Sequence, residues 1–203
     1  MKKTNYIFLL SICSLLFILA PVGIQAQRPW PPAGMRSPLH YPKFDLGIGS
    51  HTHNYESDER RDNWGGYALR GSVYLNEHLA GRMKYYNIDA RIVDFWGDER
   101  GTSDISGLSI AALAGLNWEK GFNLFGGLGL YREDFDWMDY STSWTGYTIN
   151  YGIGYRWDII SLELSGEFRD PSGIKDFYED ELGVTGDSSE IYSSTSLAIG
   201  FGF

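Results

Sequence analysis

Residues 147–169 have the sequence YTINYGIGYRWDIISLELSGEFR, in which apolar and polar side chains alternate on both sides of a two-residue turn. From Tyr147 to Trp157, aromatic residues and isoleucine alternate with threonine, asparagine, glycine and arginine. From Ile160 to Arg169, leucine and other apolar residues alternate with serine, glutamate and arginine. Because successive side chains of a strand point to opposite faces, a period of two indicates β-structure. The stretch therefore predicts a β-hairpin with one apolar face and one polar, charged face.

Six further segments share this period, and no stretch after Lys43 shows a convincing helical period over a dozen residues. The segments are 8 to 11 residues long, close to the roughly 9–11 residues that a tilted strand needs to cross a bilayer. The eight expected strands are residues 44–51, 67–75, 79–88, 108–118, 122–131, 147–157, 160–169 and 193–203. The domain is therefore expected to be all-β.

The connections between these segments alternate in length. Short turns lie at 76–78, 119–121 and 158–159, whereas the other joints span 15 to 23 residues. Short turns on one side and long loops on the other are typical of bacterial outer-membrane barrels. A soluble β-sandwich is the alternative, but it predicts no such systematic difference.

Charged side chains assign the two faces of the expected strands, because a charge that faces lipid is costly. The charges share a face with glycine and serine, while leucine, isoleucine and aromatic residues form the other face. A soluble eight-stranded carrier would have an apolar interior instead. The sequence therefore predicts an eight-stranded antiparallel up-and-down transmembrane β-barrel, whose polar interior explains the low mean hydropathy of −0.27.

Eight charged residues fall on the expected inward face, five basic and three acidic. Side chains fill the interior of a barrel this narrow, so we expect a buried ion-pair network. A proton or ion path is the functional alternative. The inward residues are Asp45, Arg70, Arg82, Lys84, Arg156, Glu163, Glu167 and Arg169.

Six of the seven tryptophans stand near the expected strand ends. Aromatic girdles mark both membrane interfaces of such barrels, so we expect these tryptophans to lie there. They are Trp118 and Trp157 at the short-turn ends, and Trp64, Trp96, Trp137 and Trp144 near the long loops.

The N-terminal region is expected to lie outside the fold. Two lysines precede an apolar run and the small-residue pattern that ends at Ala26, so residues 1–26 form an expected signal peptide cleaved near Ala26. An anchor helix is the alternative, but the run is short and ends at a proline. Residues 27–42 hold five of the seven prolines and are expected to form a periplasmic tether. The barrel is expected to comprise residues 43–203.

The last seven residues, LAIGFGF, form an alternating strand that ends in Phe201 and Phe203. This strand resembles the terminal signal that the outer-membrane barrel-assembly machinery recognises. Together with the signal peptide and the eight strands, it makes the chain resemble the small outer-membrane β-barrels (OmpA-like, OmpX-like and opacity-like). The resemblance implies a Gram-negative outer membrane. It leaves function open, because the family holds adhesins, anchors and lipid-modifying enzymes.

Catalytic and metal-binding patterns are weak. His51 and His53 are the candidate metal ligands, but two histidines alone do not make a dedicated site, so we expect no metal and no other cofactor. The motif of the lipid A deacylases is missing, and the proline-rich residues 28–42 cannot supply the helix that precedes palmitoyl-transferring barrels. We expect no catalytic residues and a monomer. A lipid A-modifying enzyme such as a deacylase-type hydrolase, and a small channel, are the alternatives.

Acidic residues outnumber basic ones by 26 to 17, and they concentrate in the expected loops 55–63, 96–104, 132–143 and 170–190. This balance argues against nucleic acid as a partner. Such loops suit a repulsive cell surface, an aromatic-acidic patch that contacts a partner, or divalent cations bound to lipopolysaccharide phosphates. We expect a non-enzymatic protein whose acidic surface loops serve envelope integrity or surface interaction, with membrane lipid and lipopolysaccharide as neighbours.

Overall fold

The computed structural model describes residues 44–56, 61–93, 99–118, 120–137, 140–182 and 190–203. The expected signal peptide and tether lie outside these residues and stay predictions. The described elements are β1 (Phe44–Glu56), β2 (Arg61–Tyr74), β3 (Leu79–Val93), β4 (Glu99–Leu116), β5 (Gly121–Trp137), β6 (Tyr140–Trp157), β7 (Ile160–Arg169), α2 (Ser172–Leu182) and β8 (Ile191–Gly202).

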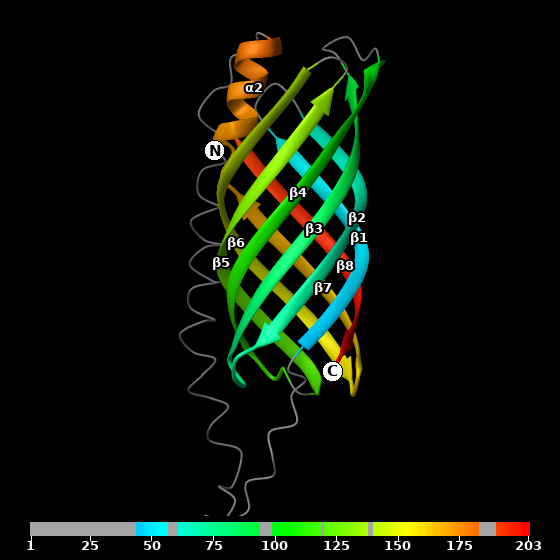
Figure 1. Ribbon diagram of the computed structural model, residues 1–203, viewed down its shortest axis with the longest axis vertical. Helices are drawn as coiled ribbons and strands as arrows, with labels where there is room; N and C mark the ends of the chain where they lie inside the picture. The colour runs from blue at the N-terminus through cyan, green and yellow to red at the C-terminus, as the bar shows by residue number, and fades with distance from the viewer. Residues whose placement is uncertain (1–43, 57–60, 94–98, 119, 138–139, 183–189) are drawn as a thin grey trace, which may run out of the picture. The chain divides into compact units, whose positions relative to one another are not determined.

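The eight strands form a closed antiparallel barrel in which each strand pairs with its neighbours in the sequence (Figure 1). Antiparallel pairing of β1 with β8 closes it, from Asp45 opposite Gly202 to Glu56 opposite Ile191. This confirms the predicted fold class. We call the end that carries the C-terminus the short-turn end, and the opposite end, where α2 lies, the hairpin end.

The strands match the prediction closely at the short-turn end but run much further at the hairpin end. Within the expected loop 132–143, residues 132–137 and 140–143 instead continue β5 and β6 in one register, from Arg132–Thr145 to Trp137–Tyr140. The inward residues Glu133 and Phe135 are buried there, whereas the outward residues Arg132, Asp134 and Asp136 are charged. Because these outward residues are polar, the sequence of this part of the strands resembles that of a loop.

The helix α2 was not expected, and it interrupts the predicted loop 170–190. Asp170 Oδ1 accepts the backbone N–H of Ser172 at 3.2 Å and so satisfies a free donor at the helix start. Ile174 and Phe177 are buried, and the ring of Phe177 lies 4.7 Å from that of Phe135, centroid to centroid. In the described part of the chain, no helix is long and apolar enough to cross a membrane.

The outward face carries a belt of exposed apolar side chains that runs through all eight strands. On β5 it extends from Phe122 to Leu130, eight residue steps that rise about 20 Å at the usual strand tilt. Above the belt, the outward rows become mostly polar, with the half-buried Ile191 of β8 as an apolar exception. The last exposed large apolar residues are Ile48, Tyr67, Tyr85, Leu108, Leu130, Tyr147, Phe168 and Leu197.

Inside the barrel, an apolar cluster closes each end of the described structure. The hairpin-end cap includes Tyr86, Phe135, Trp144, Phe177 and Tyr192. The short-turn cap consists of Tyr74, Ala80, Ala111, Leu113, Trp118 and Phe125.

The expected tryptophan girdle is wrong for most of the tryptophans that can be placed. Trp64, Trp118 and Trp144 are only 3%, 2% and 8% exposed and belong to the interior caps, whereas Trp157 is 53% exposed on the outer face. Glycine makes this possible: a Cβ on Gly115 would lie 2.3 Å from the Trp118 ring. Proximity to a strand end did not reveal which face the side chain takes. Trp96 and the side chain of Trp137 lie outside the described residues.

Candidate functional site

The interior of the barrel holds every one of the eight charged residues that the alternation pattern assigned to it. All eight are buried, and they come from β1, β2, β3, β6 and β7. Burial of so many charges is stable only if each is paired and hydrogen-bonded. Their ion pairs and hydrogen bonds divide them into two groups.

The short-turn charge cluster consists of Asp45, Arg70, Arg82, Arg156 and Glu163. Both carboxylate oxygens of Glu163 accept from Arg82, at 2.8 and 2.9 Å, and Oε2 also accepts from Arg70. Asp45 accepts from Arg156 Nη2 at 2.7 Å and pairs with Arg70 Nη2 at 3.3 Å. Arg70 therefore joins the two carboxylates.

The hairpin-end charge cluster consists of Lys84, Glu133, Glu167 and Arg169. Glu167 pairs with Lys84 Nζ and with Arg169 Nη2, each at 2.5 Å. Arg169 Nη1 also donates to Glu133. In the described part of the chain, no ion pair joins this cluster to the short-turn charge cluster.

Glu133 is the central acceptor of the hairpin end, and sequence reasoning missed it. It is fully buried and accepts from Tyr86 Oη at 2.7 Å, Trp144 Nε1 at 2.8 Å and Tyr192 Oη at 2.8 Å. It lies within residues 132–143, where an acidic loop is expected. The inward period that runs from Asn123 through Tyr131 to Phe135 would have identified it.

The candidate metal ligands His51 and His53 form part of a hydrogen-bonded chain instead. Their Nε2 atoms lie 2.8 Å apart, His51 Nδ1 lies 2.6 Å from Ser196 Oγ, and His53 Nδ1 lies 2.6 Å from Tyr192 Oη. Since Tyr192 gives its proton to Glu133, His53 Nδ1 must donate to Tyr192 and His53 Nε2 must accept from His51. All four ring nitrogens are thus engaged, and no group of three potential ligands surrounds them among the described residues.

The interior leaves little space for transport. The cavity in the middle of the barrel admits the centre of a water-sized sphere over about 10 Å³. Apolar caps lie at both ends of the charged region. The geometry therefore supports a filled barrel and gives no support to an open channel.

Solved structures with the same fold are small outer-membrane β-barrels. Neisserial surface protein A gives a TM-score of 0.56 at 10% identity over 79% of this chain and 97% of that chain. OprG from Pseudomonas aeruginosa gives 0.55 at 10% identity over 81% and 97%. Ail, the attachment invasion locus protein of Yersinia pestis, gives 0.52 at 14% identity over 80% and 99%. No protein-family model and no curated protein matches the chain.

Proposed function

We propose that this protein is an integral, non-enzymatic outer-membrane barrel of a Gram-negative bacterium, and that its acidic extracellular wall contacts lipopolysaccharide through divalent cations. The observation that carries the membrane assignment is the apolar belt around all eight strands. About 20 Å of belt is close to the roughly 25 Å band of known barrels. A soluble protein would not leave so continuous an apolar surface uncovered.

Orientation follows from the two ends of the barrel. Outer-membrane barrels place short turns in the periplasm and longer connections outside, so the hairpin end and α2 face the exterior. An epitope tag inserted between α2 and β8 should be reached by antibody on intact cells. A tag at Lys120, in a short turn, should be reached only after the outer membrane is opened. Reversed labelling would contradict this orientation.

The non-enzymatic assignment rests on the buried position of the residues that could form a catalytic serine–histidine pair. Ser196 and His51 form the only serine–histidine hydrogen bond among the described residues. Both are buried inside the barrel, where a lipid substrate has no access. Lipid A from cells with and without the gene should therefore give the same mass spectrum. A mass change that depends on the gene would establish the lipid-modifying alternative, and steady single-channel conductance in planar bilayers would establish the channel.

The acidic wall is a row of carboxylates on the outward face just above the belt. Asp89 pairs with Asp104 across β3 and β4, and Asp104 pairs with Asp136 across β4 and β5. All three are exposed. Directly opposed like charges destabilise a sheet, and divalent cations prefer carboxylate oxygens. The row therefore suits cations shared with lipid phosphates, and it disfavours polyanions such as the sucrose octasulfate seen in a complex of Ail.

This role is tested in vesicles that contain lipopolysaccharide. Mg²⁺ should raise the urea midpoint of the wild-type barrel there, and the triple substitution Asp89→Asn, Asp104→Asn, Asp136→Asn should remove that increase. The matched control is Asp158→Asn, which neutralises an exposed carboxylate in a short turn at the other end. The proposal fails if the triple variant keeps the full Mg²⁺ effect, or if the control loses it.

We further propose that the assembly machinery recognises the end of β8. Phe201 and Phe203 are 45% and 72% exposed on the outer face, and Phe203 is hydrogen-bonded to Phe44 through both backbone groups. Phe203→Ser should reduce assembly in cells while leaving refolding in detergent intact. Equal amounts of assembled barrel in cells would contradict this recognition.

A further inference from the structure

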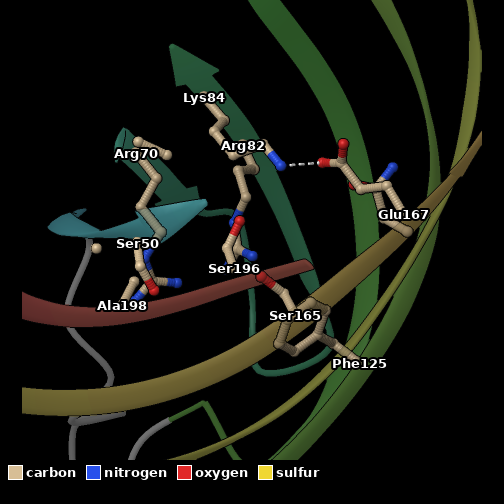
Figure 2. Close-up of a pocket in the computed structure, with 12 residues that line it drawn as sticks. Ser50, Arg70, Arg82, Lys84, Phe125, Ser165, Glu167, Ser196 and Ala198 are labelled. Atoms are coloured by element: carbon tan, nitrogen blue, oxygen red, sulfur yellow. Dashed lines mark ion pairs between the residues drawn. The ribbon is translucent and has the colours of Figure 1, made fainter. Parts of the chain in front are cut away.

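Four of the residues that line the cavity in the middle of the barrel are charged, and three of these four are basic (Figure 2). Arg70, Arg82 and Lys84 reach it from β2 and β3, and Glu167 is its single carboxylate. Its volume of about 10 Å³ is enough for one water molecule or one ion of similar size. Both charge clusters therefore border a space that can hold a single small particle.

The charges around this space do not balance. The short-turn charge cluster contains three arginines and two carboxylates, whereas the hairpin-end charge cluster contains two of each sign. Asp62 is also buried, but it lies eight residues from Arg70 along β2, roughly 26 Å away. Among the described residues, one positive charge is thus left over in the short-turn charge cluster, and two of its three arginines, Arg70 and Arg82, line the cavity. An uncompensated buried charge is strongly unfavourable.

One residue that lines this cavity has a free donor. Arg70 is buried, and its Nε–H finds no hydrogen-bond acceptor among the described residues. The backbone approaches this atom only because residue 47 is glycine: a Cβ there would lie 2.6 Å from Nε. An unpaired buried N–H costs about 1–3 kcal/mol. A water molecule could accept this bond, but it would not supply the missing negative charge.

We propose that the cavity binds one small monovalent anion, chloride in the cell, between Arg70, Arg82 and Lys84. The anion would balance the excess positive charge and accept the free N–H of Arg70. Asn150 also lines the cavity, and its side-chain amide donates only one of its two N–H groups to Thr148 Oγ1. This site is independent of the surface role proposed above, because it lies wholly inside the barrel.

Bromide is the direct probe, because it resembles chloride and scatters X-rays anomalously. Crystals of the folded barrel grown in sodium bromide should show one anomalous peak inside the cavity. A cavity with a water molecule and no anomalous signal would overturn the proposal.

Stability gives the second test. Chloride is exchanged for gluconate at constant ionic strength, and unfolding of the whole barrel in detergent is followed in urea. A dissociation constant of about 3 mM would multiply the folding equilibrium constant about 100-fold at 300 mM chloride. A wild-type barrel indifferent to chloride would overturn the proposal.

The charge argument is tested at Ser165, an inward residue that lines the cavity. Ser165→Asp supplies the missing negative charge and should abolish the dependence on chloride. Ser165→Asn, the matched control, fills a similar volume without charge. At low chloride the folding equilibrium constant of the Asp variant should be at least about tenfold larger than that of the Asn variant. Equal stability of the two variants would show that the interior carries no excess charge.

Discussion

Glu163→Gln is the most informative single change in the interior. The amide keeps the shape of the side chain and one acceptor oxygen, but it removes the charge that Arg70 and Arg82 share. Two bonds from Arg82, at 2.8 and 2.9 Å, and one from Arg70 lose their charged acceptor. The short-turn charge cluster is then left with three arginines and Asp45 alone.

The expected cost follows from burial. Glu163 is 5% exposed and both arginines are buried, so solvent cannot replace the lost charge. Removal of one partner from a buried ion pair costs about 3–5 kcal/mol. Leu162→Ala, on the outward face of the same strand, should cost at most about 2 kcal/mol, because lipid refills the space and no cavity remains.

Urea titration in lipid vesicles, followed by tryptophan fluorescence, measures both values. The partner variant Arg82→Gln completes a double-mutant cycle with Glu163→Gln. Because both single changes break the same pair, the double variant should lose less stability than the sum of the two.

Two results would refute the reasoning. If Glu163→Gln is as stable as the wild type while Leu162→Ala unfolds, the ion pairs do not hold the barrel and the two faces are misassigned. Additive effects in the cycle would show that Glu163 and Arg82 act independently.

Gly107→Ala should lower the free energy of unfolding by about 1–3 kcal/mol through overpacking, because the new Cβ would lie 2.2 Å from the Tyr86 ring. The control Gly81→Ala should be tolerated, because no atom lies within 4 Å of its new Cβ. Equal urea midpoints of the two variants would contradict this prediction. Trp118→Ala should lower the free energy of unfolding by about 3–5 kcal/mol, and Trp157→Ala should lower it clearly less, because only the Trp118 ring is buried. A larger loss for Trp157→Ala would contradict this burial and support the expected tryptophan girdle. EDTA should leave the urea midpoint in detergent unchanged, because every ring nitrogen of the buried histidine pair is hydrogen-bonded; a lower midpoint would reveal a metal.

The alternation of apolar and polar side chains predicted most of the fold. Arg156 and Glu163 could be assigned to the interior from the sequence alone, because a charge fixes the face of its strand and the period of two extends that assignment along the strand. Which charges pair could not be predicted, because Arg82 meets Glu163 across the lumen from a strand that is not its neighbour. That contact depends on barrel closure and strand tilt.

Two errors at the hairpin end, in β5 and in α2, have different physical causes. Above the apolar belt, outward residues such as Arg132 and Asp134 are polar, so β5 looks like a loop there although Glu133 and Phe135 remain inside. Among the residues of α2 whose side chains the structure describes, Ile174 and Phe177 are the buried apolar ones. A helical period so sparse gives too weak a signal beside many acidic residues.

The central claim, a barrel whose apolar face meets lipid and whose charged face is filled, is tested most directly by labelling β6. Cys13 is the only cysteine of the chain and belongs to the expected signal peptide, so single cysteines can be placed along residues 147–157 of the mature barrel in vesicles. Spin labels at the apolar positions Ile149, Tyr151 and Ile153 should be accessible to lipid-soluble oxygen, and a label at Asn150 should be shielded. Equal oxygen access at all four positions, or the opposite alternation, would contradict the account.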